Sequence, residues 1–311
     1  MNWYKGNLHC HTTESDGRLP PADVASYYKK LEYDFLGIAD HYKLTPPEMY
    51  EKPSGILGIP TAEFAGVRCA HVVGAWIESD ASAFHLDNEE TCPIGDIFTG
   101  ILKQIKRAKG IPILCHPLWY WTFDYEKIKE VADWKHFELC NAAPDCNSTP
   151  IPGFTPGDDL WDSLLSNGRR VFAVASDDAH YYEPPYSPLT GIGGRGFIVI
   201  KADSLSRNAL RSAFDDGHFY ASTGAELEEY SLSENGMRII VKNFHDHVAS
   251  FEFIGENGEI LQHSIGLKAG YEFTGDETYV RVRIATTSGC HLWTQPVFLD
   301  SVKEEMKWIN A

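Results

Sequence analysis

The sequence has no long apolar run and no strongly basic stretch, and each absence argues against a class of protein. No apolar run approaches the roughly 20 residues that a membrane-spanning helix requires. Residues 1–6 lack the basic end and the apolar stretch of a signal peptide. We therefore expect a cytoplasmic protein that makes no membrane contact.

Basic residues are scarce relative to acidic ones. The chain holds 27 Lys and Arg against 44 Asp and Glu, which gives a net charge of −17. Stable binding to duplex nucleic acid depends on a Lys/Arg face that releases counterions, and no basic run of that kind is present. The charge argues against stable duplex binding. It is compatible with a small phosphorylated substrate that cations hold inside a pocket.

The cysteines lack the spacing of a disulfide framework or a structural zinc site. There are seven, an odd number, and no Cys-x-x-Cys occurs. This pattern is typical of free thiols in a reducing compartment. Three of them, Cys10, Cys115 and Cys140, lie in apolar runs, and we interpret these as small buried residues.

Residues 7–222 alternate between strand-like and helix-like segments. Strands are expected over residues 8–11, 35–39, 56–63, 69–77, 111–115, 136–139, 171–175 and 197–200. Helices are expected over residues 22–31, 94–109, 125–132, 158–165 and 204–214. This order predicts an α/β domain with a parallel sheet. A closed barrel fits better than an open doubly wound sheet, because no Gly-rich phosphate loop follows the first strand.

The pattern changes after residue 224. Short strand-like runs separated by turns replace the alternation, and no helix pattern appears until residues 301–309. We predict an α/β barrel over residues 1–224 and a small all-β, sandwich-like domain over residues 225–311.

The most informative motif is His9-Cys10-His11, at the expected end of the first strand. Residues two apart in a strand point to the same face, so both imidazoles can bind one ion while Cys10 points away. Further groups close later apolar runs: Asp40-His41, Glu63, His116-Pro117 and Asp178-Ala179-His180. Side chains at the carboxyl ends of barrel strands collect on one face. Imidazole with carboxylate suits Mn²⁺, Zn²⁺ or Fe²⁺ better than Mg²⁺ or Ca²⁺, so a multi-metal hydrolase site is predicted.

Together these motifs resemble those of the PHP superfamily (polymerase and histidinol phosphatase domains). The matching residues, in chain order, are His9-x-His11, Asp16, Asp40-His41, Glu63, His71, His116-Pro117 and Asp178-x-His180. The phrases Ser15-Asp16-Gly17, Ile38-Ala39-Asp40-His41, His71-Val72-Val73-Gly74 and Tyr220-Ala221-Ser222-Thr223-Gly224 are similar to its stand-alone phosphoesterase branch. The resemblance covers about residues 6–224 and implies a distorted, TIM-like (β/α)7 barrel with two to three divalent ions.

The resemblance also implies a ligand set for each ion. The sets are His9, His11, Glu63 and Asp178 for the first ion, Glu63, His71 and His116 for the second, with Glu63 bridging, and Asp16, His41 and His180 for the third. The expected reaction is hydrolysis of a phosphate ester, in a small metabolite or nucleotide, by a metal-activated hydroxide.

Four residues are candidates for catalysis beyond metal binding. Asp178 and His180 are candidate proton carriers. Arg18 and Arg195 are candidate phosphate clamps, because a guanidinium offers a planar bidentate fork. Asp40 is left out of the ligand set, because strand alternation points it away from His41.

Two other functions stay open. The same ions can activate water against an amide or a lactone, and a binding or scaffold protein can keep a vestigial metal site. Residues 119–121 and Asn141 are weaker candidates for substrate contact, and His245-Asp246-His247 is interpreted as a solvated turn. The sequence leaves the substrate, the metal and the oligomeric state open.

Overall fold

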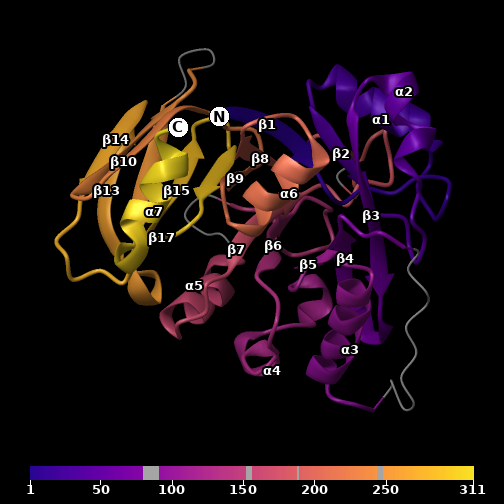
Figure 1. Ribbon diagram of the computed structural model, residues 1–311, viewed down its shortest axis with the longest axis horizontal. Helices are drawn as coiled ribbons and strands as arrows, with labels where there is room; N and C mark the ends of the chain where they lie inside the picture. Colours follow the sequence, from indigo (N-terminus) through magenta and orange to yellow (C-terminus); the bar gives the residue numbers. More distant parts are fainter. Residues whose placement is uncertain (80–90, 152–155, 188, 244–247) are drawn as a thin grey trace.

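The computed structural model describes residues 1–79, 91–151, 156–187, 189–243 and 248–311 (Figure 1). Its strands are β1 (Asn2–Asn7), β2 (Phe35–Ile38), β3 (Leu57–Ala65), β4 (His71–Ala75), β5 (Ile111–Leu114), β6 (His136–Asn141), β7 (Phe172–Ser176), β8 (Phe197–Ala202), β9 (Phe219–Ser222), β10 (Leu227–Ser233), β11 (Gly236–Val241), β12 (Ala249–Ile254), β13 (Ile260–Gly266), β14 (Lys268–Glu272), β15 (Tyr279–Thr286), β16 (His291–Thr294) and β17 (Val297–Phe298). Its α-helices are α1 (Pro21–Lys30), α2 (Glu51–Ser54), α3 (Ile94–Arg107), α4 (Tyr125–Ile128), α5 (Asp158–Ser166), α6 (Arg207–Asp215) and α7 (Val302–Ile309).

Strands β1 to β7 form the barrel half of the molecule. They follow one another in the order β1-β2-β3-β4-β5-β6-β7, and β8 pairs with β1 on the other side. The two ends of this row meet where the His11 N–H donates to the Ala179 carbonyl at 2.9 Å and the Asp178 N–H donates to the His9 carbonyl at 3.0 Å. These bonds join the carboxyl ends of β1 and β7. The predicted α/β fold with a distorted barrel is confirmed.

The sheet is not parallel throughout, which corrects one expectation. Pairs β1–β2, β2–β3, β5–β6 and β6–β7 are parallel, but β4 runs antiparallel to both β3 and β5. Only residues 66–70 connect β3 to β4, whereas a parallel crossover needs a dozen or more residues. The expected strand 69–77 begins too early, because Val67–Cys69 forms a short 3₁₀ turn at the hairpin.

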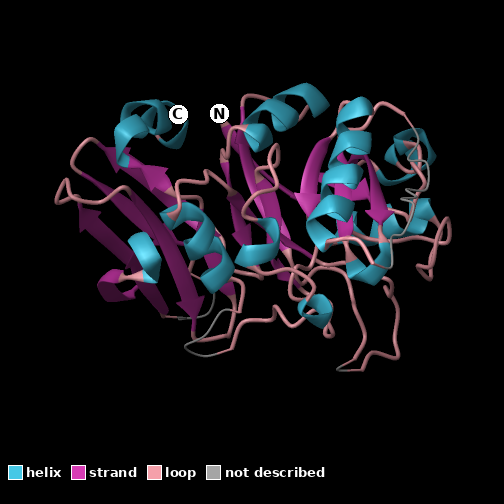
Figure 2. Ribbon diagram, turned by 90° about the horizontal axis from the view of Figure 1, so that it is seen from below, coloured by secondary structure: helices cyan, strands magenta, loops and turns pink. Residues whose placement is uncertain are grey.

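Helices cover the outside of the barrel strands (Figure 2). Helix α3 shows why: Ile97, Ile101 and Ile105 recur at helical spacing, and all three are fully buried. Burying such a stripe against β4 and β5 stabilises both layers, since each large aliphatic side chain contributes about 1.5 to 3 kcal/mol. Because side chains alternate along a strand, the side chains on the opposite face of these strands point into the barrel.

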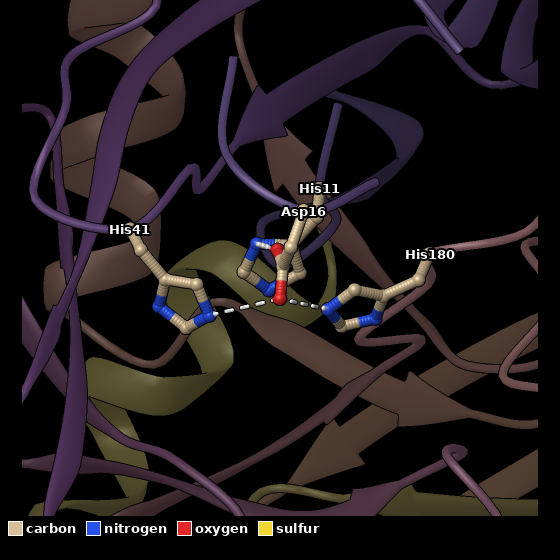
Figure 3. Close-up of side chains that lie close together, drawn as sticks. All are labelled: His11, Asp16, His41 and His180. Carbon is tan, nitrogen blue, oxygen red and sulfur yellow. Dashed lines mark ion pairs between the residues drawn. The ribbon is translucent and has the colours of Figure 1, made fainter. Parts of the chain in front are cut away.

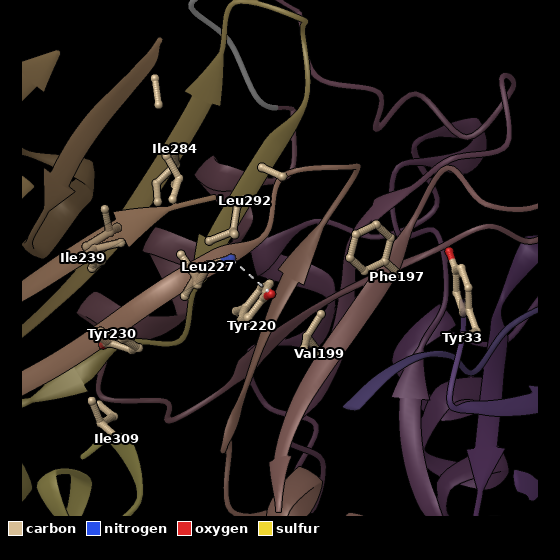
Figure 4. Close-up of a cluster of buried hydrophobic side chains, with 14 of the residues drawn as sticks. Tyr33, Phe197, Val199, Tyr220, Leu227, Tyr230, Ile239, Ile284, Leu292 and Ile309 are labelled. Carbon is tan, nitrogen blue, oxygen red and sulfur yellow. Dashed lines mark hydrogen bonds between the residues drawn. The ribbon is translucent and has the colours of Figure 1, made fainter. Parts of the chain in front are cut away.

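Strands β8 and β9 lead from the barrel into the second half of the molecule. Strand β9 pairs with β16, so one sheet continues through β15, β12 and β13, while β10, β11 and β14 form a separate antiparallel sheet. One apolar cluster contains Tyr33 and Phe197 of the barrel together with Leu227, Ile239 and Ile284 of the second half (Figure 4). The division at residue 224 thus lies inside a shared sheet and core, and the assignment of two domains stays a prediction.

Two sequence expectations about composition can be compared with the structure. Cys10, Cys115 and Cys140 are buried free thiols, as predicted. Within the described ranges, none of the helices combines the length and the apolar character that crossing a bilayer requires.

Candidate metal centre

The edge where the barrel closes carries the nine predicted ligands. They are His9 and His11 after β1, Asp16 in the following loop, His41 after β2, Glu63 in β3, His71 at the start of β4, His116 after β5, and Asp178 and His180 after β7. His71 begins its strand instead of ending one. Because β4 is antiparallel, its first residue lies at the same edge as the carboxyl ends of β3 and β5.

Four of these side chains converge deep in the barrel: His9, His11, Glu63 and Asp178. Asp178 Oδ1 lies 3.3 Å from His9 Nε2 and 3.1 Å from His11 Nε2. Glu63 Oε2 lies 3.4 Å from each of the same two nitrogens. All four residues are buried. This is the set predicted for the first ion.

Glu63 turns its other oxygen toward a second group. Its Oε1 lies 2.9 Å from His71 Nδ1 and 3.4 Å from His116 Nε2. The two oxygens of one carboxylate therefore face two different sets of nitrogens. This arrangement suits a ligand that bridges two neighbouring ions, as predicted for Glu63.

A third group surrounds Asp16 at the solvent side (Figure 3). Asp16 Oδ2 lies 3.6 Å from His41 Nε2 and 3.4 Å from His180 Nε2, and its Oδ1 lies 3.6 Å from His11 Nδ1. The structure thus adds His11 to the three residues predicted for this ion. One ring nitrogen of His11 faces the first group and the other faces the third.

The spacing of these donor atoms fits divalent ions. Two donors about 2.1 Å from one ion, at roughly 90 to 109° to each other, are about 3.0 to 3.4 Å apart. The first two groups show separations of 2.9 to 3.4 Å. The buried atom His9 Nε2 has no hydrogen-bond partner, although carboxylate oxygens lie 3.3 and 3.4 Å away. A lone pair aimed at a shared ion accounts for this combination.

The charges of the site also fit cations. Burial alone would raise the pKa of Glu63 and of Asp178, but the surrounding histidines lower both values. Both carboxylates are therefore ionised at neutral pH, as metal ligands must be. Burial alone would lower the pKa of His41, yet Asp16 and Glu63 raise it to about 9. The negative field that favours a proton on His41 would equally favour a divalent cation.

Asp40 lies outside the ligand groups. Its carboxylate accepts hydrogen bonds from the backbone N–H and hydroxyl of Thr12, at 2.8 and 2.7 Å, and from the hydroxyls of Ser15 and Thr45, at 2.7 and 2.5 Å. These bonds fix the loop that leads from His11 to Asp16. Asp40 therefore shapes the site without facing it.

Glu138, on β6, belongs to the site but was not among the predicted residues. Its side chain is 1% exposed. Glu138 Oε1 lies 2.7 Å from His9 Nδ1, and Oε2 accepts the backbone N–H of His116 at 2.7 Å. The sequence did hold a signal, because an ionisable residue within the apolar run Phe137–Cys140 must find buried partners.

A cavity of about 540 Å³ opens onto the three groups. Its lining comprises seven of the nine ligands together with Trp119, Ala143, Pro144, Asp145, Cys146, Tyr181, Leu189 and Gly191. Among the described residues that line it there is no Lys or Arg, and Asp145 adds a further acidic group. An anionic substrate would therefore depend on bound cations or on arginines at the rim.

The two predicted phosphate clamps lie at different distances from this cavity. Arg18 is exposed, and its guanidinium lies 3.5 Å from the hydroxyl of Tyr181, which lines the cavity. Arg195 lines another cavity, of about 350 Å³, with Thr223 from the end of the barrel half and Gly289 from the second half. Both clamp roles stay predictions, and Arg18 is the residue that contacts the cavity wall.

The weaker candidates for substrate contact separate in the same way. Trp119 lines the metal cavity, whereas Tyr120 and Trp121 are exposed and line a different cavity of about 800 Å³. Asn141 is buried, and its amide donates to Glu138 at 2.9 Å and to Asp178 at 3.2 Å, so it contacts the ligand groups. The His245-Asp246-His247 motif lies outside the described residues.

Comparisons with known proteins give structural matches only. Neither a protein-family profile nor a curated protein matches the sequence. A two-domain protein from Bacteroides vulgatus that contains a predicted PHP-like metal-dependent phosphoesterase matches with 12% identity and a TM-score of 0.49, over 91% of this chain and 90% of that one. A proposed metal-dependent phosphoesterase from Bifidobacterium adolescentis matches with 13% identity and a TM-score of 0.39, over 58% and 90%.

An amidohydrolase from Chromobacterium violaceum, with bound sulfate and no metal, matches with 13% identity and a TM-score of 0.38, over 60% of this chain and 93% of that one. At these identities and scores the function proposed below rests on the side chains of this protein. The chain is similar in structure to PHP-like metal-dependent phosphoesterases, and it gathers His, Asp and Glu side chains into groups that can hold divalent ions.

Proposed function

We propose that this protein is a metal-dependent phosphoesterase that hydrolyses a small phosphorylated metabolite or nucleotide. The placement of Glu63 carries the proposal, because its two oxygens face separate sets of histidine nitrogens within 3.4 Å. Oε2 faces His9, His11 and His41, and Oε1 faces His71 and His116. When bound, divalent ions of the Mn²⁺, Zn²⁺ or Fe²⁺ class would supply an activated water and a counter-charge for the phosphoryl oxygens.

His180 is the proposed proton carrier. Its Nδ1 lies 3.0 Å from the carbonyl oxygen of Asp178, which can only accept, so Nδ1 carries a proton. The other nitrogen, Nε2, then faces Asp16, and the imidazole lines the cavity with 28% of its side chain exposed. A proton on Nε2 can pass to the leaving-group oxygen as the P–O bond breaks. Asp178 is the weaker candidate, since it is buried and its Oδ1 faces His9 and His11.

This assignment depends on the number of ions. With two ions bound, in the groups that share Glu63, His180 Nε2 is free to carry a proton. A third ion beside Asp16 would occupy the same nitrogen. Metal content and the effect of His180→Gln on kcat are therefore linked. A kcat loss with two ions per chain supports proton transfer, and a kcat loss that accompanies loss of a third ion supports ligation.

The test of the proposed function combines elemental analysis with hydrolysis of p-nitrophenyl phosphate and of nucleotides, before and after chelation and with Mn²⁺ restored. We expect two to three ions per chain, phosphate release that chelation abolishes, and competitive inhibition by inorganic phosphate. The matched control is Glu63→Gln, which keeps the size of the side chain and removes its charge. Phosphate release that is unaffected by chelation and by Glu63→Gln would contradict the proposal.

A second candidate is hydrolysis of an uncharged amide or lactone. One observation favours it, namely that the described lining of the cavity contains acidic residues but no Lys or Arg. A panel of lactones and anilides assayed under the same conditions separates the two. Turnover of these substrates without inhibition by inorganic phosphate would favour the second candidate. Arg18→Ala distinguishes the two candidates further. If Arg18 contacts a substrate phosphate, this variant should raise KM for phosphorylated substrates and leave KM for lactones and anilides unchanged.

A further inference from the structure

We propose that Glu138 is a positioning residue, which sets the ring tautomer of His9 and links the two ligand groups that share Glu63. The inference rests on the metal site of the proposed function, and it concerns a carboxylate that is not itself placed among the ligands. Glu138 lies in β6, the strand whose neighbours β5 and β7 lead into His116 and Asp178.

Four polar groups surround the Glu138 carboxylate. The Ser176 hydroxyl donates to Oε1 at 2.5 Å, and His9 Nδ1 lies 2.7 Å from the same oxygen. Oε2 accepts the backbone N–H of His116 at 2.7 Å and the amide of Asn141 at 2.9 Å. A backbone N–H and an amide NH₂ can only donate, and an ionised carboxylate can only accept. The contact with His9 is therefore an Nδ1–H donated to Glu138.

This bond determines which nitrogen of His9 is available to a metal. With the proton on Nδ1, the neutral ring presents a lone pair at Nε2. That atom is the one that lies 3.3 Å from Asp178 Oδ1 and 3.4 Å from Glu63 Oε2, and it has no hydrogen-bond partner. A carboxylate that accepts from the far nitrogen of a metal-binding histidine fixes ring orientation and makes the ligand more basic.

The same carboxylate also reaches the second ligand group. His116 has a backbone φ of +26°, which a residue other than glycine rarely adopts, and its N–H is held by Glu138. Asn141 connects the carboxylate to the first group again, since its amide lies 3.2 Å from Asp178 Oδ2. Glu138 thus holds one ligand of each group, and a change in it should alter both.

A merely structural role predicts a different result from a positioning role. If Glu138 only satisfied buried donors, its loss would lower the free energy of unfolding and leave the metal affinity of the folded protein unchanged. Asp162 offers the matched control, because it is also a buried carboxylate that accepts two hydrogen bonds, but from Arg281 and not from a histidine. Asp162→Asn and Glu138→Gln remove one buried negative charge each.

The experiment uses the full-length protein and Zn²⁺, which is diamagnetic and permits ¹⁵N NMR of the imidazoles. In the Zn²⁺-loaded wild type we expect His9 to carry its proton on Nδ1. Glu138→Gln should raise the Kd for Zn²⁺ by about 10- to 100-fold, measured by chelator competition, and should shift the His9 ring signals. Asp162→Asn should lower stability in urea while its Kd stays that of the wild type.

Two results would overturn the inference: a His9 proton on Nε2 in the Zn²⁺-loaded wild type, or an unchanged Kd in folded Glu138→Gln. The first needs no variant, so it decides the matter even if Glu138→Gln fails to fold. Failure of the proposed function looks different. A protein that binds Zn²⁺ with the expected tautomer but hydrolyses no phosphate ester would refute the phosphoesterase alone, whereas a wild type that binds no metal would refute both.

Discussion

Arg281 is a fully buried cation that connects the second half of the molecule to the barrel, and its replacement makes a quantitative test. It lies on β15, and its guanidinium donates to both carboxylate oxygens of Asp162, at 2.8 and 2.7 Å. A third nitrogen lies 3.1 Å from Asp158 Oδ1, and the ring of Trp161 lies 4.6 Å from the guanidinium. All three partners belong to α5, on the barrel side.

The expected cost follows from what the change leaves behind. Arg281→Met keeps an unbranched side chain but removes the charge, so Asp162, with its side chain only 11% exposed, loses both hydrogen bonds from the guanidinium. Breaking a buried pair by removing one partner costs about 3 to 5 kcal/mol. Asp158 retains its pair with Arg283, so the lower part of that range applies. With a urea m-value of roughly 3 kcal/mol/M, the midpoint should fall by about 1 M.

The assay is urea unfolding of the metal-free protein, followed by tryptophan fluorescence and by far-UV circular dichroism. The double variant Arg281→Met with Asp162→Leu removes both charges, and it should recover most of the lost free energy, because an apolar replacement of a whole buried pair is often neutral. A single variant within about 0.5 kcal/mol of the wild type would refute the reasoning. So would strict additivity of the two changes.

Three further predictions concern the ligand groups, the barrel interior and the domain division. Glu63 contacts two ligand groups and Asp16 a single one, so elemental analysis should find at most one ion per chain in Glu63→Gln. Asp16→Asn should lose at most one ion relative to the wild type. Equal losses in the two variants would contradict the grouping. Burial lowers the pKa of His136 from 6.5 to about 4, so its contribution to stability is complete above pH 6.5 and falls by up to about 3 kcal/mol as the pH drops toward 4. Urea midpoints in EDTA at pH 4.5 and 7.5 should therefore differ less in His136→Gln than in the wild type, and an unchanged difference would exclude this histidine as the cause. A fragment of residues 1–224 should fail to fold cooperatively, because it lacks Arg281 and also Gln295, whose amide pairs with the N–H and C=O of Ala173 at 2.9 and 2.8 Å. Circular dichroism measures its folding, and a hydrolysis assay measures its activity. An active fragment would show that the second half is accessory.

The positions of the candidate ligands could be predicted from the sequence because the signal is local. His41 and His116 follow short buried strands, and Glu63 lies near the carboxyl end of β3, so all three reach the same edge of the barrel. His71 shows where local reading fails. Its side chain reaches the same edge for the opposite reason, at the start of an antiparallel strand. The expected strands 56–63 and 69–77 left only residues 64–68 between them, and a connection that short already excludes a parallel crossover.

Other features of the site depend on contacts between distant parts of the chain. No pattern in the sequence says that the two ring nitrogens of His11 face different ligand groups, because that follows from how Asp16 and Asp178 fold back over it. The placement of Arg18 beside Tyr181 of the metal cavity, and of Arg195 in the lining of another cavity, is equally non-local. Glu138 could be predicted in part. Its burial in an apolar strand follows from the sequence, but its partners His9 and His116 follow two other strands, β1 and β5.

The closure of the barrel and the assembly of the candidate metal centre depend on the same few atoms. The hydrogen bonds that join the carboxyl ends of β1 and β7 are made by the backbones of His9, His11, Asp178 and Ala179, three of which carry ligands of the first group. Ligands that are about 170 residues apart in sequence are thus brought together by the seam itself. An ion that binds only the closed arrangement stabilises it by mass action, so metal binding and barrel closure are expected to be one equilibrium. Bound cations would thereby compensate the negative charges of Glu63 and Asp178, which are buried beside this seam.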